Sequence, residues 1–315
     1  MSRMKPFAIS LAMAAILSAG SAFAAEPDSC KTVRFSDVGW TDITATTATA
    51  SVILEALGYT PDVQVLSVPV TYASLKSKDI DVFLGNWMPT MEADIKPYLE
   101  DKSVETVVTN LEGAKYTLAV PAYTYDAGVK DFADIAKFKD KLDNKIYGIE
   151  AGNDGNRLIL DMIEQDKFGL KDFELVESSE AGMLAAVSKA ANSKQDVVFL
   201  GWEPHPMNAN IDMKYLTGGD EVFGPNFGGA TVATNVRAGY TTECPNVGAL
   251  LKNMVFSLKM ENEIMGAILN DGTEPKAAAT AWLKANPDAL TPWLAGVTTF
   301  DGGDANAAVK SALGL

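Results

Sequence analysis

Hydrophobic residues follow two kinds of spacing along the chain, one typical of strands and one typical of helices. The two kinds alternate, which predicts strands and helices in turn. The pattern first predicts strands over residues 33–38, 63–68 and 80–84, with helices over 43–57 and 72–76. It then returns with strands over residues 146–149, 173–176 and 197–200 and helices over 156–168 and 183–191. Gly58 and Gly169 are predicted to close the longer helix of each set. Strands that alternate with helices are typical of an α/β fold with parallel-rich sheets.

The two sets of elements end in nearly the same sequence. The third strand of the first set runs into FLGNWMP and that of the second into FLGWEP, so Trp87 and Trp202 stand 115 positions apart. We therefore predict two copies of one α/β unit. Because ligand sites of parallel sheets lie beyond the carboxyl ends of the strands, we expect the two tryptophans to face each other there. Gly85 and Gly201 are expected to leave room for a ligand to approach.

Two Gly-marked segments connect the copies and predict a hinge between two lobes. Residues 111–125 lead from the first copy to the second, and residues 223–235 lead back. The helical spacing over 247–269 and 276–285 then belongs to the first lobe. The predicted lobes are residues 25–112 with 220–315, and residues 113–219.

The first 24 residues have the pattern of an export signal. Arg3 and Lys5 precede an uncharged apolar stretch over residues 6–19, and a small-residue AFA motif ends at Ala24. The apolar stretch is shorter than the ~20 residues that span a bilayer. We expect a signal peptide of residues 1–24, cleaved near Ala24, and a mature protein in the periplasm.

The chain has two cysteines, Cys30 and Cys244. An oxidising compartment favours their pairing, so we predict a disulfide between them. Such a bridge would return the later part of the chain to the first lobe. The alternative is a pair of buried thiols that do not react with each other.

Composition and charge restrict the class of function. The 315 residues are 47% hydrophobic and 21% charged, as in ordinary folded proteins, which excludes a disordered chain. Lys and Arg number 26 against 41 Asp and Glu, and the net charge of −15 argues against nucleic acid as a partner. One histidine, His205, and two cysteines are too few for a His/Cys metal site. The sequence has no GxSxG, HExxH or phosphate-binding Gly loop, and we expect no metal and no cofactor.

Three of the five tryptophans, Trp40, Trp87 and Trp202, follow predicted strands rather than lying in apolar helical stripes. Any one of them alone is better explained as a packing residue, but three at equivalent strand ends favour a ligand site. Aromatic faces around a cavity attract a cation by ~0.5 to ~2 kcal/mol. Cages of this kind suit a quaternary ammonium group, because it has no N–H that needs a hydrogen-bond acceptor.

Two polar residues occupy corresponding turns of the copies, Asp42 in DVGWTD and Asn153 in GIEAGNDGN. The plain interpretation of both is a helix cap or a turn residue. Alternatively, an anionic Asp42 accepts a hydrogen bond from a ligand hydroxyl, attracts a cation and repels a ligand carboxylate. This second interpretation favours choline over glycine betaine.

These motifs, together with WLKANPDALTPWL near the C-terminus, resemble the substrate-binding proteins of glycine betaine and choline ABC transporters. The resemblance covers essentially the whole predicted mature chain. It implies a two-lobed, type II periplasmic binding-protein fold that closes over its ligand by hinge motion. It also implies an aromatic box of Trp40, Trp87, Tyr116 and Trp202, with Asp42 and Asn153 at the hydroxyl end of the ligand. Tyr116 comes from the resemblance alone.

The expected function is therefore that of a periplasmic, monomeric binding protein rather than an enzyme. It would capture choline, with acetylcholine or betaine bound more weakly, and deliver it to an ABC transporter permease in the inner membrane. One alternative is a glycine betaine-binding protein of the same family. Another is a periplasmic hydrolase of choline esters, which would have to use His205. A ligand-loaded partner of a chemoreceptor is a third.

Overall fold

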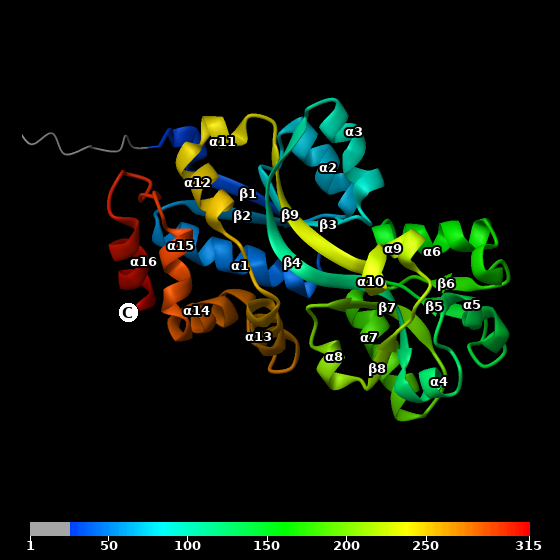
Figure 1. Ribbon diagram of the computed structural model, residues 1–315. Coiled ribbons are helices and arrows are strands. Elements are labelled where there is room, and N and C mark those ends of the chain that lie inside the picture. The colour runs from blue at the N-terminus through cyan, green and yellow to red at the C-terminus, as the bar shows by residue number, and fades with distance from the viewer. Residues whose placement is uncertain (1–25) are drawn as a thin grey trace, which may run out of the picture.

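The computed structural model describes residues 26–315, and Figure 1 shows them as two lobes joined by long strands. The predicted signal peptide lies outside the described residues. Along those described residues, no helix is both long and apolar enough to cross a membrane.

The two predicted repeats are present, and their strands are arranged alike. The first repeat consists of β1 (Thr32–Asp37), α1 (Thr41–Ala56), β2 (Thr60–Val65), α2 (Val68–Ser77) and β3 (Val82–Met88). The second consists of β5 (Lys145–Tyr147), α6 (Asp154–Glu164), β6 (Glu174–Val176), α7 (Glu180–Asn192) and β7 (Val198–Glu203). In each lobe the first strand lies between the other two and is parallel to both, giving β2-β1-β3 and β6-β5-β7.

The ends of the longer helices differ between the copies. Gly58, with φ +91°, follows α1 as predicted and takes the left-handed conformation that stops a helix. In the second copy, the predicted helix over 156–168 stops earlier, because Asp166 has φ +53° and breaks the helical path. Gly169 therefore closes a separate short turn, Lys167–Gly169, and not α6.

Two long strands join the lobes into one sheet. They are β4 (Val104–Pro121) and β9 (Gly229–Arg237), which pair with each other in antiparallel fashion. β9 also pairs with β3, and β4 pairs with β7 and with β8 (Met213–Tyr215). The strand order is β2-β1-β3-β9-β4-β7-β5-β6, parallel within each lobe and antiparallel at the crossing. The predicted lobe boundaries stay a prediction, and the first of them falls inside β4.

The remaining helices cover the faces of the sheet, and most of them belong to the C-terminal part of the chain. They are α3 (Glu92–Glu100), α4 (Ala122–Asp126), α5 (Phe132–Ile135), α8 (Met207–Asn210), α9 (Asp220–Phe223), α10 (Pro225–Gly228), α11 (Tyr240–Glu243), α12 (Pro245–Asn253), α13 (Leu258–Leu269), α14 (Pro275–Ala285), α15 (Leu290–Trp293) and α16 (Ala305–Leu313). Figure 1 shows α13 and α14 against α1, so the chain returns to the first lobe as predicted.

The single helical stretch predicted over 247–269 is divided into α12 and α13. Met254 leaves the helical region with ψ 88°, and the N–H of Phe256 donates to the carbonyl of Asn110 on β4 at 2.7 Å. Ser257 then caps α13 by accepting from the N–H of Met260. A hydrogen bond to the sheet therefore competes with the helical pattern over these residues.

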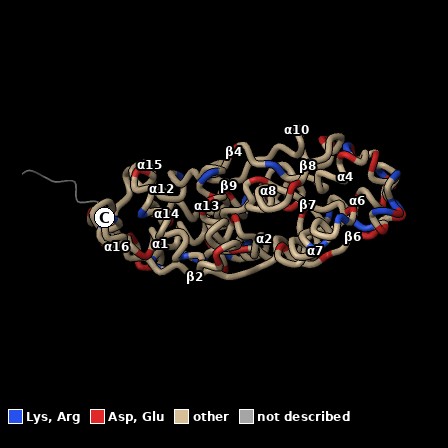
Figure 2. The backbone as a smooth tube through the Cα atoms, turned by 90° about the horizontal axis from the view of Figure 1, so that it is seen from below, with Lys and Arg blue, Asp and Glu red and all other residues tan. Residues whose placement is uncertain are grey.

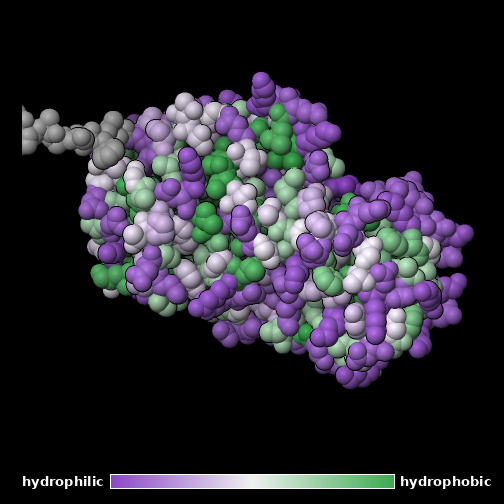
Figure 3. All heavy atoms as spheres, in the orientation of Figure 1, coloured by the Kyte–Doolittle hydropathy of each residue, from purple (hydrophilic) through white to green (hydrophobic). Residues whose placement is uncertain are grey.

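The predicted disulfide between Cys30 and Cys244 is formed. It joins the turn before β1 to the segment between α11 and α12, so the N-terminal part of the first lobe is tied to the part of the chain that returns to it. Figure 2 shows an elongated molecule with basic and acidic residues interspersed along it. On the face drawn in Figure 3, hydrophilic and hydrophobic residues are interspersed over both lobes.

Candidate functional site

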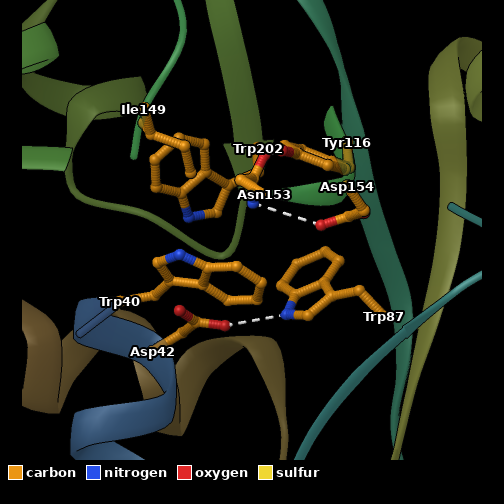
Figure 4. Close-up of a pocket in the computed structure, with 8 residues that line it drawn as sticks. All are labelled: Trp40, Asp42, Trp87, Tyr116, Ile149, Asn153, Asp154 and Trp202. Atoms are coloured by element: carbon orange, nitrogen blue, oxygen red, sulfur yellow. Dashed lines mark hydrogen bonds between the residues drawn. The ribbon is translucent and has the colours of Figure 1, made fainter. Parts of the chain in front are cut away.

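The six residues predicted to form the site line one cavity between the lobes. The empty space between their side chains is about 260 Å³, which includes open solvent. Its lining consists of Trp40, Asp42, Trp87, Tyr116, Ile149, Asn153, Asp154 and Trp202, all drawn in Figure 4. Each lobe and the crossing strand β4 contribute side chains, so the complete cavity exists only where the lobes meet.

The parallel strands deliver the tryptophans to the cavity. Trp40 is the N-cap residue of α1, in the loop that follows β1. Trp87 and Trp202 lie in the last residues of β3 and β7 rather than after them, which corrects the loop positions predicted for them. The carboxyl ends of the strands in both lobes point toward the crossing region, as expected for a ligand site of parallel sheets.

Gly85 and Gly201 do not serve the cavity, contrary to the prediction. A Cβ added to Gly85 would lie 2.7 Å from the Ile43 side chain, and one added to Gly201 would lie 3.0 Å from the Met213 side chain. Neither glycine lines the cavity. They allow the backbone of β3 and β7 to pack closely against Ile43 and Met213. Gly201 adjoins Trp202 in β7, so its position faces away from that side chain.

Four aromatic side chains form the walls of the cavity, and all are at least 94% buried. The Tyr116 ring lies 5.9 Å from the Trp87 ring at 56° and 6.2 Å from the Trp202 ring at 81°. Tyr116 stands directly opposite Trp202 in the β4–β7 ladder. Directly paired residues of an antiparallel ladder share a face, so the pairing of β4 with the FLGW strand is what brings Tyr116 to the site.

Asp42 is a buried carboxylate at the floor of the cavity, in the first turn of α1. One of its oxygens, Oδ2, accepts from Trp87 Nε1 at 3.0 Å, and the other, Oδ1, has no partner (Figure 4). The pKa of Asp42 is raised to about 8, chiefly by burial and also by the nearby Glu180 carboxylate, while the Trp87 hydrogen bond acts in the opposite direction. Asp42 is not a helix cap, since Trp40 occupies that position.

Asn153 is both a helix cap and a cavity residue. Its Oδ1 accepts from the N–H of Asn156 at 3.1 Å, which caps α6, and from the Tyr116 hydroxyl at 2.9 Å. Its Nδ2 donates to Asp154 Oδ1 at 3.1 Å. The two interpretations given for this residue from its sequence position are therefore compatible.

Asp154 is a cavity residue that the sequence analysis missed. Its Oδ2 is buried and has no partner, and burial raises its pKa to about 7. The available signal was its place beside Asn153 in GNDGN, at the turn equivalent to that of Asp42. The cavity thus holds one carboxylate from each lobe, each with an oxygen free to accept a hydrogen bond.

Two further carboxylates of the second lobe reach the start of α1 in the first lobe. Glu150 accepts from Trp40 Nε1 at 2.7 Å, and burial raises the pKa of this carboxyl. Glu180 accepts from the N–H and the hydroxyl of Thr41. Among the described residues, no Lys or Arg forms an ion pair with Asp42, Glu150 or Asp154.

An aromatic cavity surrounded by unpaired carboxylates favours a cation. The ring faces attract positive charge through their quadrupoles, and each carboxylate adds a Coulomb attraction that burial strengthens. The same ring faces and carboxylates would repel a negatively charged ligand. Within residues 26–315 the structure has no group of three His, Cys, Asp or Glu side chains that could hold a metal ion.

Comparison with known proteins agrees with this chemistry. Residues 31–285 match the family model of the substrate-binding domain of ABC-type glycine betaine transport systems. The chain belongs to this family.

Solved structures of the family reproduce the fold of this substrate-binding protein. An ABC-transporter choline-binding protein in complex with choline has a TM-score of 0.91, 73% identity, and coverage of 91% of this chain and 100% of its own. The same coverage and identity accompany a TM-score of 0.85 for such a protein in an unliganded semi-closed conformation. This chain therefore superposes better on the choline complex than on the unliganded semi-closed structure.

Two further relatives are described with glycine betaine or carnitine, and a third is uncharacterized. Lactococcal OpuAC, closed on glycine betaine, is 26% identical with a TM-score of 0.75 over 84% of this chain and 99% of its own. A glycine betaine/carnitine transport binding protein of Listeria monocytogenes is 31% identical over 52% of this chain and 53% of its own length. An uncharacterized protein of Chromohalobacter salexigens is 59% identical over 44% of this chain and 87% of its own.

Proposed function

We propose that this substrate-binding protein captures choline in the cavity between its lobes and delivers it to an ABC transporter permease. The observation that carries the proposal is Asp42, whose free carboxylate oxygen faces a cavity walled by four aromatic rings. The 73% identity to a structure described as a choline complex supports it.

In the proposed complex, the four aromatic residues surround the trimethylammonium group and replace the water around it. This group has no N–H, so an aromatic wall without acceptors leaves nothing unsatisfied. The choline hydroxyl donates to Asp42 Oδ1 and accepts from the second N–H of Asn153 Nδ2. The proposed ligand-binding residues are thus the six predicted ones, Trp40, Asp42, Trp87, Tyr116, Asn153 and Trp202.

We further propose that the protein acts as a monomer in the periplasm after removal of residues 1–24. The disulfide supports an oxidising compartment. The family supports a partner of the ABC transporter kind. In this proposal, the closed lobes form the surface that the permease in the inner membrane recognises.

Glycine betaine is the second candidate ligand, because relatives of this chain are described with it. It carries a carboxylate where choline carries a hydroxyl. Asp42 and Asp154 would repel that carboxylate inside a cavity of low dielectric constant. The cavity therefore favours choline.

Hydrolysis of choline esters is not supported by the geometry around His205. A serine-protease-like triad needs the imidazole between the nucleophile and the acid. Here Glu180 lies between Thr41 and His205, and the imidazole bonds Glu180 and the N–H of Met207. We propose a binding protein and not an enzyme.

Calorimetric titration with choline, glycine betaine and acetylcholine tests the proposed ligand. We expect choline to bind most tightly and Trp202→Leu to raise its Kd about tenfold or more, since one wall of the cation site is lost. Trp282→Leu is the matched control, because Trp282 lies outside the cavity and bonds Glu263. Tighter binding of glycine betaine would assign the protein to the second candidate, and absence of choline binding would refute the proposal.

A further inference from the structure

Helix α1 is capped by the opposite lobe. Its N-cap residue, Trp40, makes no side-chain capping bond. Instead, the N–H of Thr41 donates to Glu180 Oε2 at 2.9 Å, and the Thr41 hydroxyl donates to Glu180 Oε1 at 2.6 Å. Glu180 is the first residue of α7 in the second lobe and is 95% buried. A carboxylate at a helix N-terminus meets both unpaired N–H groups and the positive end of the helix dipole.

His205 holds this carboxylate in place. The N–H of Met207 donates to His205 Nδ1 at 2.9 Å, so the ring proton lies on Nε2, which donates to Glu180 Oε1 at 3.1 Å. The same imidazole lies 4.8 Å from the Trp202 ring, centre to centre, at 70°. A continuous set of contacts therefore runs from the cavity wall to the start of α1.

We propose that the Thr41–Glu180–His205 chain, hereafter the interlobe chain, fastens the closed lobes and sets how long the ligand stays bound. This inference rests on the proposed function, since it concerns release of the captured cation. In it Glu180 and His205 are positioning residues, and neither lines the cavity. Opening the lobes would separate Thr41 from Glu180 and leave α1 without its cap.

A bound cation favours this fastening. The Glu180 and Asp42 carboxylates are close enough for the charge of one to raise the pKa of the other. Without a cation between the lobes, closure beside the Glu180 carboxylate disfavours the ionised form of Asp42, whereas a quaternary ammonium in the cavity offsets the repulsion between the two carboxylates. The interlobe chain and the ligand therefore stabilise the same closed arrangement.

Stopped-flow tryptophan fluorescence with choline tests the proposal on the full chain. We expect Glu180→Gln to raise the dissociation rate about tenfold and to change the association rate little, because hydrogen bonds to charged groups are strong and form only on closure. Glu164→Gln is the matched control, an exposed carboxylate of the same lobe with the same chemical change. It should leave both rates unaltered.

Substitutions at two further positions, Thr41 and His205, separate fastening from loss of charge near the ligand. Thr41→Val removes one donor without changing charge and should raise the dissociation rate about threefold. Its effect should not add to that of Glu180→Gln, since both break one chain of contacts. His205→Gln keeps a donor for Glu180 and should stay near the wild-type rate, whereas His205→Leu should release choline as fast as Glu180→Gln. Thermal unfolding of the ligand-free variants checks that each is folded.

The outcomes are distinguishable. If the wild type binds choline and the Thr41 and Glu180 variants dissociate at its rate, or if their effects add, the interlobe chain does not fasten the lobes and the proposed function stands. If the wild type gives no choline signal, the proposed function fails first.

Discussion

The most informative single residue is Asp42, because its carboxyl group is buried, and burial makes the ionised form unfavourable. Its pKa rises from 3.8 to about 8, chiefly through burial. A folded-state pKa above the unfolded value means that the folded protein binds more protons, so the free energy of unfolding of the ligand-free protein falls as pH rises across this window. A cationic ligand stabilises the ionised carboxylate and so offsets the loss of folding stability that ionisation of Asp42 causes.

Choline affinity should therefore depend on pH in a direction fixed by Asp42. Binding displaces the carboxyl proton, so Kd should fall as pH rises from 6 and level off above about 8. Asp42→Asn should weaken binding by about 2 kcal/mol, roughly thirtyfold in Kd, at pH 8.5, and by much less at pH 6, where the wild-type carboxyl is already neutral. Calorimetry at both values measures the two ratios.

Asp301→Asn is the control for this prediction, since Asp301 is an exposed carboxylate outside the cavity. Its Kd for choline should match the wild type at both pH values. An equal loss of affinity for Asp42→Asn at pH 6 and pH 8.5 would contradict the role given to its charge.

At the scale of elements, the start of α6 shapes the cavity through a missing side chain. Gly155 stands in its first turn, and a Cβ added there would collide with the Tyr116 hydroxyl and lie 2.7 Å from Tyr116 Cζ. Tyr116 must remain in place to close the box and to bond Asn153. The helix therefore needs glycine at this position for the site and not for its own stability.

Gly155→Ala should raise the Kd for choline about tenfold, because displacement of Tyr116 removes one aromatic contact. Gly266→Ala in α13 is the matched control. Its nearest neighbour would be 4.0 Å away, so alanine should raise the free energy of unfolding by about 0.5–1 kcal/mol and leave Kd unchanged. Titration and thermal unfolding of both variants make the comparison, and an unchanged Kd for Gly155→Ala would contradict the packing argument.

At the scale of the whole molecule, β4 and β9 make two lobes into one sheet, and a disulfide ties the first lobe together. The bridge spans 214 positions of sequence. It lies at the start of β1, whereas the cavity lies beyond the other end of this six-residue strand, about 20 Å away at the usual rise per residue. Removal of the disulfide should therefore lower the stability of the protein without weakening ligand binding.

Replacing both Cys30 and Cys244 by serine should lower the free energy of unfolding by about 3–5 kcal/mol, since the unfolded chain gains freedom. The Kd for choline should stay within about twofold, because the cavity is untouched. Denaturant titration and calorimetry of the double variant measure the two quantities. A large loss of affinity in a variant that remains folded would show that the bridge shapes the site.

Sequence patterns determined the elements and the pairing of the repeats. Hydrophobic periodicity placed the strands and helices of both copies, and the shared FLG–Trp ends placed Trp87 and Trp202 at corresponding strand ends. The errors were local. The stretch over 247–269 has a continuous helical pattern, but a hydrogen bond from Phe256 to β4 interrupts it. Such long-range bonds leave no trace in local periodicity.

The residues of the candidate site also fall into those that the sequence indicated and those that only the structure revealed. Local sequence indicated Trp40, Asp42, Trp87, Asn153 and Trp202, because each stands at a turn or strand end of a repeat. Tyr116 needed the family resemblance, and Asp154, Glu150 and Glu180 needed the structure. Burial, like charges and an unpartnered oxygen arise only when two distant segments meet, so the raised pKa of Asp42 and the capping of α1 by Glu180 were decided by the tertiary structure alone.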